Sequence, residues 1–379
     1  MHERKKGKIS IKSKVKLRNK NDMSIAYTPG VAEPCKLIAK NREDVYKYTS
    51  KGNIVAVVTD GSAVLGLGDI GAEASIPVME GKAILFKEFA NIDAFPIAIN
   101  SRDVDEIVNT IRLISPMFGG INLEDISAPR CFEIEEKLKK IMDIPVMHDD
   151  QHGTAIVVLA GLINALKIVK KKLSDIKIIL SGAGAAGDGI TRLLLNYGAK
   201  NVILVDRAGA IYYGRQDNMT PEKKNLAKIT NPNREKGSLR EVIRGADVFI
   251  GVSAPGLLDQ SMIKIMGNRP IIFAMANPIP EIMPNDAKKA GAFIVATGRS
   301  DFSNQINNVL AFPGVFRGAL DVRAREINTE MKIAAAEALA KMVKPSVDKI
   351  IPSPFDKNLV KNVAEAVRNA AIKTGVANF

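Results

Sequence analysis

Two of the chain's three histidines lie in one short acidic segment, residues 147 to 154. His148 and His152 are four positions apart and enclose Asp149 and Asp150. Two histidines at this spacing bind zinc in metalloproteases, but that motif lies within a helix and places Glu directly after the first His. Here the pair sits at a predicted strand end, before a helix that starts near residue 154, so zinc is the weaker interpretation.

A second acidic pair, Glu124 and Asp125, indicates a different kind of site. Together with Asp150, this pair offers carboxylate oxygens, which are the ligands that Mg²⁺ and Mn²⁺ prefer. The alternative is that both acidic pairs are helix caps or solvated turns. The residue types alone leave these two interpretations open.

The motif Gly-x-Gly-x-x-Gly occurs twice, at 66–71 and at 182–187. The second copy follows an apolar strand candidate, opens a helix without proline, and precedes Asp206 by nineteen residues. Its glycines permit a tight turn, the helix N-terminus attracts the pyrophosphate, and the carboxylate accepts ribose hydroxyls. It therefore predicts a nicotinamide dinucleotide site, whereas the first copy, which runs into Pro77, predicts a loop. The residues of the second copy are Gly182, Ala183, Gly184, Ala185, Ala186 and Gly187.

The choice of dinucleotide depends on two adjacent residues, Asp206 and Arg207. A carboxylate at this position favours the free ribose of NAD, while an arginine beside it can accept the 2′-phosphate of NADP. We expect NAD, with NADP as the alternative.

The elements that position these residues alternate between helix and strand. Short apolar runs that end in polar, glycine or proline loops predict parallel strands at 176–180, 202–205, 248–252, 271–274 and 293–295. Apolar periodicity predicts helices over 154–169, 187–197, 326–343 and 358–373. We therefore expect a Rossmann-like, doubly wound α/β domain with terminal helices over 154–379. Strand candidates at 54–58 and 96–99 predict a mixed α/β domain over 1–153.

Composition limits the class of protein. The chain has 379 residues, 46% of them hydrophobic, which is enough for two domains with cores of their own. Cys35 and Cys131 show no CxxC spacing, so we expect neither a disulfide framework nor a thiolate metal site. The longest apolar stretch, 154–166, is shorter than the roughly 20 residues that cross a bilayer. No apolar signal-peptide core follows the N-terminus, so we expect a cytoplasmic protein without a membrane partner.

Positive charge is concentrated at the N-terminus. The net charge is +13, and residues 1–20 hold nine Lys or Arg and one Glu. Such a run suggests nucleic-acid contact, but it has no aromatic residue for base stacking. Ile9, Ile11, Val15 and Leu17 fall near strand alternation, which favours a solvated N-terminal strand. A nucleic-acid-binding protein with a vestigial dinucleotide domain is the remote alternative.

Several ordered motifs resemble the malic enzymes, and within them the short prokaryotic branch. They are AYTPGVA at 26–32, TDG at 59–61, GLGDIG at 66–71, PVMEGK at 77–82, ED at 124–125, HDDQHGT at 148–154, ANP at 276–278 and NNVLAFPG at 307–314. The resemblance extends from about Lys8 to Ala377. It implies oxidative decarboxylation of L-malate to pyruvate and CO₂, with reduction of NAD or NADP and a requirement for Mg²⁺ or Mn²⁺.

The resemblance also implies catalytic roles. Lys82 would be the base for the C2 hydroxyl, supported by Asp149, and Tyr27 the general acid that protonates the enolate to pyruvate. A lysine acts as a base near neutrality only where burial or a nearby cation lowers its pKa. Asn277 and Asn308 match positions that contact the nicotinamide or the substrate carboxylate.

By the same resemblance, Glu124, Asp125 and Asp150 hold the divalent metal, which polarises the C2 oxygen. One departure concerns Ala63, where the longer eukaryotic branch has an arginine that binds a substrate carboxylate. Another lysine, an asparagine or a partner subunit must supply that anchor. Family precedent and the C-terminal apolar helices predict a homodimer. A malolactic relative that releases lactate, or an oxaloacetate-decarboxylating relative, is the alternative within enzymes.

Overall fold

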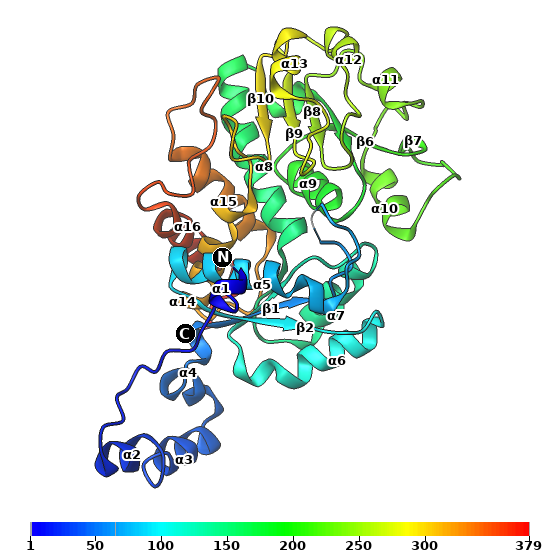
Figure 1. The fold of residues 1–379 in the computed structure, drawn as a ribbon. Coiled ribbons are helices and arrows are strands. Elements are labelled where there is room, and N and C mark those ends of the chain that lie inside the picture. The colour runs from blue at the N-terminus through cyan, green and yellow to red at the C-terminus, as the bar shows by residue number, and fades with distance from the viewer. Residues whose placement is uncertain (1, 65, 379) are drawn as a thin grey trace.

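The computed structural model of the chain describes residues 2–64 and 66–378 and shows two sheets flanked by helices (Figure 1). The predicted α/β class, with a Rossmann-like sheet in the second half, is confirmed. The larger helices of the first half are α5 Ala72–Ala90, α6 Val104–Ile114 and α7 Arg130–Ile141. Those of the second half are α8 Asp149–Val169, α9 Ala185–Asn196, α10 Pro221–Ile229, α14 Phe312–Asp321, α15 Thr329–Lys341 and α16 Leu359–Lys373. The shorter helices are α1 His2–Lys5, α2 Lys20–Ala26, α3 Ala32–Lys40, α4 Val45–Tyr48, α11 Leu239–Val242, α12 Gln260–Lys264 and α13 Pro284–Lys289.

The first sheet has four parallel strands in the order β2-β1-β3-β4. They are β1 Ile54–Thr59, β2 Asp93–Ala98, β3 Gly120–Leu123 and β4 Val146–His148. Every residue of β1 is buried, as expected for a mostly apolar strand that is covered on both faces. Apolar side chains of α6 and α7 pack on one face, and Phe312 and Phe316 of α14 belong to the core on the other.

The second sheet has six strands in the order β10-β9-β8-β5-β6-β7, all parallel except β7. They are β5 Lys177–Ser181, β6 Asn201–Asp206, β7 Gly209–Ala210, β8 Val248–Gly251, β9 Ile271–Ala274 and β10 Ile294–Thr297. Helices α8 and α9 cover one face, and α11 to α13 cover the other. The reversal of strand order beside β5 places the glycine turn at the switch point, where such sheets bind ligands.

Helix α8 connects the two sheets and begins at Asp149, earlier than the start near residue 154 that the apolar periodicity predicted. The prediction was wrong because polar residues occupy the first turn of α8. The helix dipole stabilises carboxylates at this end, so the helix can begin there without an apolar pattern. The predicted domain boundary at residue 153 falls inside this helix. By length and composition α8 is the one described helix long and apolar enough to cross a membrane, but 72% of that window is buried, which is typical of a core helix.

Helix α5 contradicts the argument that Pro77 excludes a helix after the first glycine motif. It runs through Pro77 and buries Met79, Lys82 and Phe86. The proline removes one backbone hydrogen bond, but the buried face of the following turns holds the helix together. The prediction of a loop at 66–71 is confirmed.

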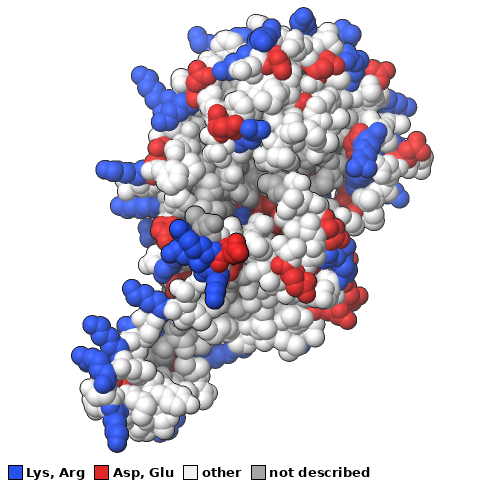
Figure 2. All heavy atoms as spheres, viewed as in Figure 1, with Lys and Arg blue, Asp and Glu red and all other residues white. Residues whose placement is uncertain are grey.

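The N-terminal arm, residues 9–41, projects from the rest of the molecule and carries α2 and α3 (Figure 1). No residue of this arm is buried. The predicted N-terminal strand is wrong, because residues 2–19 contain only α1 and irregular backbone and pair with no strand among the described residues. Lys and Arg side chains gather on the arm in Figure 2, and Ile11 and Leu17 are exposed between them.

Candidate active site

Three carboxylates meet where two neighbouring strands of the first sheet end. Glu124 and Asp125 follow β3, and Asp150 lies in the first turn of α8, directly after β4, which pairs with β3. One oxygen from each of the three residues lies within 4.8 Å of the others. Carboxylate oxygens at this spacing fit one divalent cation such as Mg²⁺ or Mn²⁺.

The environment of this carboxylate cluster favours a cation. Glu124 and Asp125 are buried. Burial raises the pKa of Glu124 and of Asp150, and each is also raised by a neighbouring carboxylate. Like charges held this closely in a buried place are stabilised by a bound cation, so the donor set fits the metal that the sequence resemblance implied.

Lys82 reaches the cluster from α5. Its Nζ lies 2.7 Å from Asp149 Oδ2 and 2.9 Å from Glu124 Oε1, and all three side chains are buried. The ammonium group also lies 4.1 Å from the centre of the Phe312 ring. Burial lowers the pKa of Lys82, but Asp149 and Glu124 outweigh burial and hold that pKa above its ordinary value. Lys82 is thus a charged lysine while both carboxylates face it.

Asp149 is positioned by a glycine. A Cβ atom at Gly153 would lie 1.8 Å from Asp149 Oδ1 and 3.2 Å from Asn308 Cβ. Only glycine therefore lets Asp149 fold back along α8, and the absence of a side chain at Gly153 also lets the Asn308–Leu310 turn approach this part of the helix. Burial raises the pKa of Asp149 to about 6, although Lys82 opposes the rise. Asp149 Oδ1 is buried and accepts no hydrogen bond within the described part of the chain.

The two histidines of this segment are not arranged as zinc ligands. His152 Nε2 lies 2.9 Å from Glu135 Oε2, and its Nδ1 lies 3.0 Å from Lys332 Nζ. Burial lowers the pKa of His152 to about 3, so its ring is neutral. His148 is fully buried, and Glu135 also accepts a hydrogen bond from its backbone N–H. This network ties the start of α8 to α7 and α15.

The glycine turn in the second sheet opens into a cavity of about 770 Å³. The turn lies between β5 and α9, and Gly182 has φ +117°, which only glycine adopts readily. A Cβ at Gly187 would lie 1.9 Å from the Gly182 carbonyl oxygen, whereas a Cβ at Gly184 would meet no atom within 4 Å. The last glycine is required for packing, and the middle one leaves room for a pyrophosphate above the N-terminus of α9. Asp206 and Arg207 line the same cavity.

A second cavity, of about 640 Å³, brings the two halves of the chain together. Gly66 and Leu67 of the first glycine motif form one side of it, and Asn277, Arg299 and Asn307 lie on the other. A Cβ at Gly66 would approach Pro278 Cδ to 3.3 Å. The loop that the sequence predicted at 66–71 therefore forms one wall of a cleft, and Asn277 lies on the opposite wall.

Arg299 also lines this cavity, and no sequence motif predicted it as a site residue. Its guanidinium pairs with Asp301, with Nε–Oδ1 2.8 Å and Nη2–Oδ2 2.6 Å, and Nη1 donates to the Pro278 carbonyl oxygen at 3.1 Å. One signal in the sequence could have indicated it: Arg299 lies along the chain between Asn277 and Asn308, which were both predicted as site residues.

The structure brings Lys82, Asp149 and Asn308 to the carboxylate cluster and places the predicted dinucleotide residues in cavities of their own, but Tyr27 lies apart from all of them. This residue follows α2 in the N-terminal arm, its side chain is 69% exposed, and it contacts no residue of the carboxylate cluster. Ala63 donates its backbone N–H to the Asp125 carbonyl oxygen at 2.9 Å, so the loop that lacks the arginine rests directly on the carboxylate cluster.

Comparisons with known proteins match nearly the whole chain. The malic enzyme N-terminal domain family matches residues 5–139, and the malic enzyme NAD binding domain family matches residues 151–373. The chain is 61% identical to the bifunctional malic/malolactic enzyme of Bacillus subtilis, over 100% of this chain and 93% of the relative.

Two further relatives are named after different dinucleotides. The probable NADP-dependent malic enzyme of Rickettsia prowazekii is 52% identical, over 99% of this chain and 51% of the relative. The solved structure of the NAD-dependent malic enzyme of Thermotoga maritima is 49% identical, with 97% of each chain covered and a TM-score of 0.95.

Proposed function

The chain belongs to the malic enzyme family, and we propose that it converts L-malate to pyruvate and CO₂ while reducing NAD or NADP. One observation supports the assignment above others: Lys82, a buried lysine, contacts Asp149 and Glu124 beside a carboxylate cluster that suits a divalent cation. Malate oxidation requires such a proton acceptor at its C2 hydroxyl and a hydride acceptor in the neighbouring cleft.

The side chains divide the reaction between them. Because both carboxylates face it, Lys82 carries a proton, and it acts as a base only after passing that proton to Asp149, 2.7 Å away. A cation held by Glu124 would favour this transfer, since it would offset the negative charge that raises the pKa of Lys82. The neutral Nζ then takes the proton of the C2 hydroxyl. A dinucleotide held at the glycine turn would supply the acceptor for the hydride of C2, and cleavage of the C3–C4 bond would then release CO₂. Glu124, Asp125 and Asp150 would hold Mg²⁺ or Mn²⁺, which would supply a Lewis acid for the C2 oxygen. Tyr27 returns a proton to C3 of the enolate.

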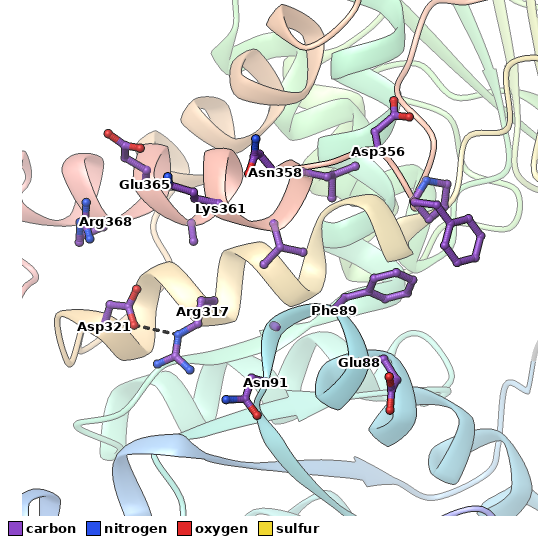
Figure 3. Close-up of a pocket in the computed structure, with 16 residues that line it drawn as sticks. Glu88, Phe89, Asn91, Arg317, Asp321, Asp356, Asn358, Lys361, Glu365 and Arg368 are labelled. Atoms are coloured by element: carbon purple, nitrogen blue, oxygen red, sulfur yellow. Dashed lines mark hydrogen bonds and ion pairs between the residues drawn. The ribbon is translucent and has the colours of Figure 1, made fainter.

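Tyr27 serves the site of a partner subunit in this proposal. Helices α2 and α3 bury no residue, so within one chain the N-terminal arm has no core to hold it. It exposes Ile25 and Leu37 besides Tyr27, a surface that a second copy of the chain would cover. The cavity between α5, α14 and α16 is lined mostly by charged and polar side chains (Figure 3), and its apolar part includes Phe89, which contacts the exposed Phe355. We therefore propose a homodimer with shared active sites.

Subunit complementation tests this arrangement. Tyr27→Phe and Lys82→Ala variants are mixed, dissociated and reassociated, and malate-dependent pyruvate release is measured. If Tyr27 acts on the partner, mixed dimers contain one intact site, and a 1:1 mixture recovers about a quarter of wild-type activity by random pairing. If Tyr27 acts on its own chain, every site lacks one residue and no activity returns, which would refute the shared site.

Asn277, Asn308 and Arg299 bind the substrate and the nicotinamide. Asn308 adjoins Asp149, and Asn277 lines the cleft with Arg299. A guanidinium binds a carboxylate with two hydrogen bonds, as Arg299 already binds Asp301. A malate carboxylate would have to displace Asp301 from Arg299, and in this proposal it does so, which gives the anchor that Ala63 cannot supply.

Residues 1–153 form the malate and metal domain and residues 154–379 the dinucleotide domain, joined through α8. Both cysteines are free, which suits a reducing cytoplasm.

Absorbance of the reduced nicotinamide tests the main assignment. Protein, L-malate and Mg²⁺ or Mn²⁺ are combined with NAD and with NADP, and pyruvate is measured in parallel. No reduced cofactor with either dinucleotide would refute the proposal. Because the Bacillus subtilis relative is named malic/malolactic, lactate is assayed too, and lactate without net reduction of cofactor would favour the malolactic alternative.

A further inference from the structure

Asp206 is surrounded by donors from its own chain. Oδ1 accepts hydrogen bonds from the Ala208 backbone N–H and from Arg215 Nη1, both at 2.9 Å. Oδ2 accepts from Arg215 Nη2 at 2.6 Å, Lys223 Nζ at 2.7 Å and Asn218 Nδ2 at 3.2 Å. A carboxylate offers about four lone-pair sites, so these five donors occupy it fully.

This occupation changes what Asp206 can do for a dinucleotide. To reach Asp206, the ribose hydroxyls would have to displace Lys223 or Asn218 from its carboxylate. The ion pair between Asp206 and Lys223 is nearly buried, because the two side chains are 9% and 13% exposed. Arg215 is more deeply buried still, at 4%. The negative charge that usually rejects a 2′-phosphate is therefore compensated by two cations within 3 Å.

The same wall of the cavity presents a further positive charge. Arg207 follows Asp206, lines the cavity and is exposed, and its side chain forms no hydrogen bond or ion pair with a residue in the described ranges. Glu222 lines the wall as the opposing carboxylate. Counting Arg215, which lies behind the wall on Asp206, the three cations Arg207, Arg215 and Lys223 outnumber the two carboxylates of Asp206 and Glu222.

We infer that Asp206 anchors the loop from Arg207 to Asn218, and that the cavity accepts the 2′-phosphate of NADP on Arg207. This inference rests on the proposed dinucleotide cavity and goes further by assigning the group that reads the 2′ position. A guanidinium forms paired, charge-assisted hydrogen bonds with phosphate, and each such bond is stronger than one to a neutral hydroxyl. NADP is therefore used at least as well as NAD, contrary to the preference for NAD that Asp206 suggested in the sequence.

Calorimetric titration of the whole protein, without malate, tests the inference. The probes are 2′,5′-ADP and 5′-AMP, which differ only in the 2′-phosphate. We expect wild type to bind 2′,5′-ADP more tightly. Arg207→Ala should weaken 2′,5′-ADP about ten- to a hundredfold and leave 5′-AMP nearly unchanged, as loss of a hydrogen bond to a charged group predicts. Arg112→Ala, an exposed arginine of α6 outside the cavity, is the matched control and should change neither affinity.

Tighter binding of 5′-AMP than of 2′,5′-ADP to wild type would overturn the inference. So would an equal loss of both probes in Arg207→Ala. Failure of wild type to bind either probe would instead contradict the dinucleotide cavity itself, so the two failures are distinguishable. Loop anchoring has its own readout: Asp206→Ala should increase proteolytic cleavage between Arg207 and Asn218, and unchanged cleavage would contradict the anchoring role.

Discussion

Replacing Lys82 with alanine should affect stability and catalysis by separate routes. In the folded protein Lys82 Nζ lies within 3 Å of Asp149 and Glu124, and all three groups are buried. Its removal leaves two buried carboxylates without their cation. Breaking a buried ion pair in this way costs about 3 to 5 kcal/mol of the free energy of unfolding. Loss of the general base should lower kcat about 10²- to 10⁴-fold.

The stability cost should depend on pH and on metal. Burial already raises the pKa of Asp149 to about 6, and loss of Lys82 raises it further. The folded variant then binds more protons than the unfolded chain, so the variant should recover stability as pH falls from 8 towards 5.5. Mg²⁺ or Mn²⁺ should also stabilise the variant more than wild type, because the cation replaces the lost charge.

Urea unfolding of metal-free protein at pH 8 and pH 5.5 measures the effect. Lys82→Met keeps an apolar side chain beside Phe312 and separates the loss of charge from the loss of packing. Lys87→Ala, on the same helix, removes a lysine that is 51% exposed and pairs with Asp93, and it should cost less than about 1 kcal/mol. If Lys82→Met is as stable as Lys87→Ala at pH 8, or keeps kcat within tenfold of wild type, the reasoning is wrong.

Three further predictions concern the dinucleotide turn, the substrate anchor and the metal. Gly187→Ala places a Cβ 1.9 Å from the Gly182 carbonyl oxygen and so distorts the turn. Fluorescence titrations with NADH and NADPH should show at least about a tenfold loss of affinity. Unchanged affinity would contradict the assigned turn. Arg299→Ala should raise the KM for malate about tenfold or more with little change in NADPH binding, and an unaltered KM would remove Arg299 as the anchor. The affinity for Mn²⁺, measured by paramagnetic resonance, should decrease as the pH is lowered from 8 to 5.5. Burial raises the pKa of Glu124 and of Asp150, so at low pH the metal must displace protons from these carboxylates. An affinity that does not change with pH would count against these ligands.

The sequence predicted the second sheet well because each of its longer strands has a short apolar run at its centre. Predicted strands at 271–274 and 202–205 correspond to β9 at Ile271–Ala274 and β6 at Asn201–Asp206. Burial on both faces leaves no polar alternation in such strands. The ends of the apolar run therefore lie close to the ends of the strand. The same reasoning placed Asp206 at a strand end, where the structure has it.

Other features depend on contacts that no local pattern contains. The donors around Asp206 come from residues up to seventeen positions later, Arg215, Asn218 and Lys223. Nothing in the spacing of Asp206 and Arg207 shows that the carboxylate is already occupied. The start of α8 at Asp149 was missed for a related reason, since its first turn is polar and faces the carboxylate cluster rather than the core.

The first glycine motif shows why context decides what a short motif does. It follows strand β1 and precedes helix α5, as a dinucleotide turn would, yet Gly66 and Gly68 have φ of +76° and +78° and form a loop across the cleft. That loop lies against Pro278 and lines the cavity with Arg299. Glycine is needed there because the backbone is left-handed and because the two halves of the chain approach closely. The same residues that suggested a second dinucleotide site therefore form the wall that faces the predicted substrate anchor.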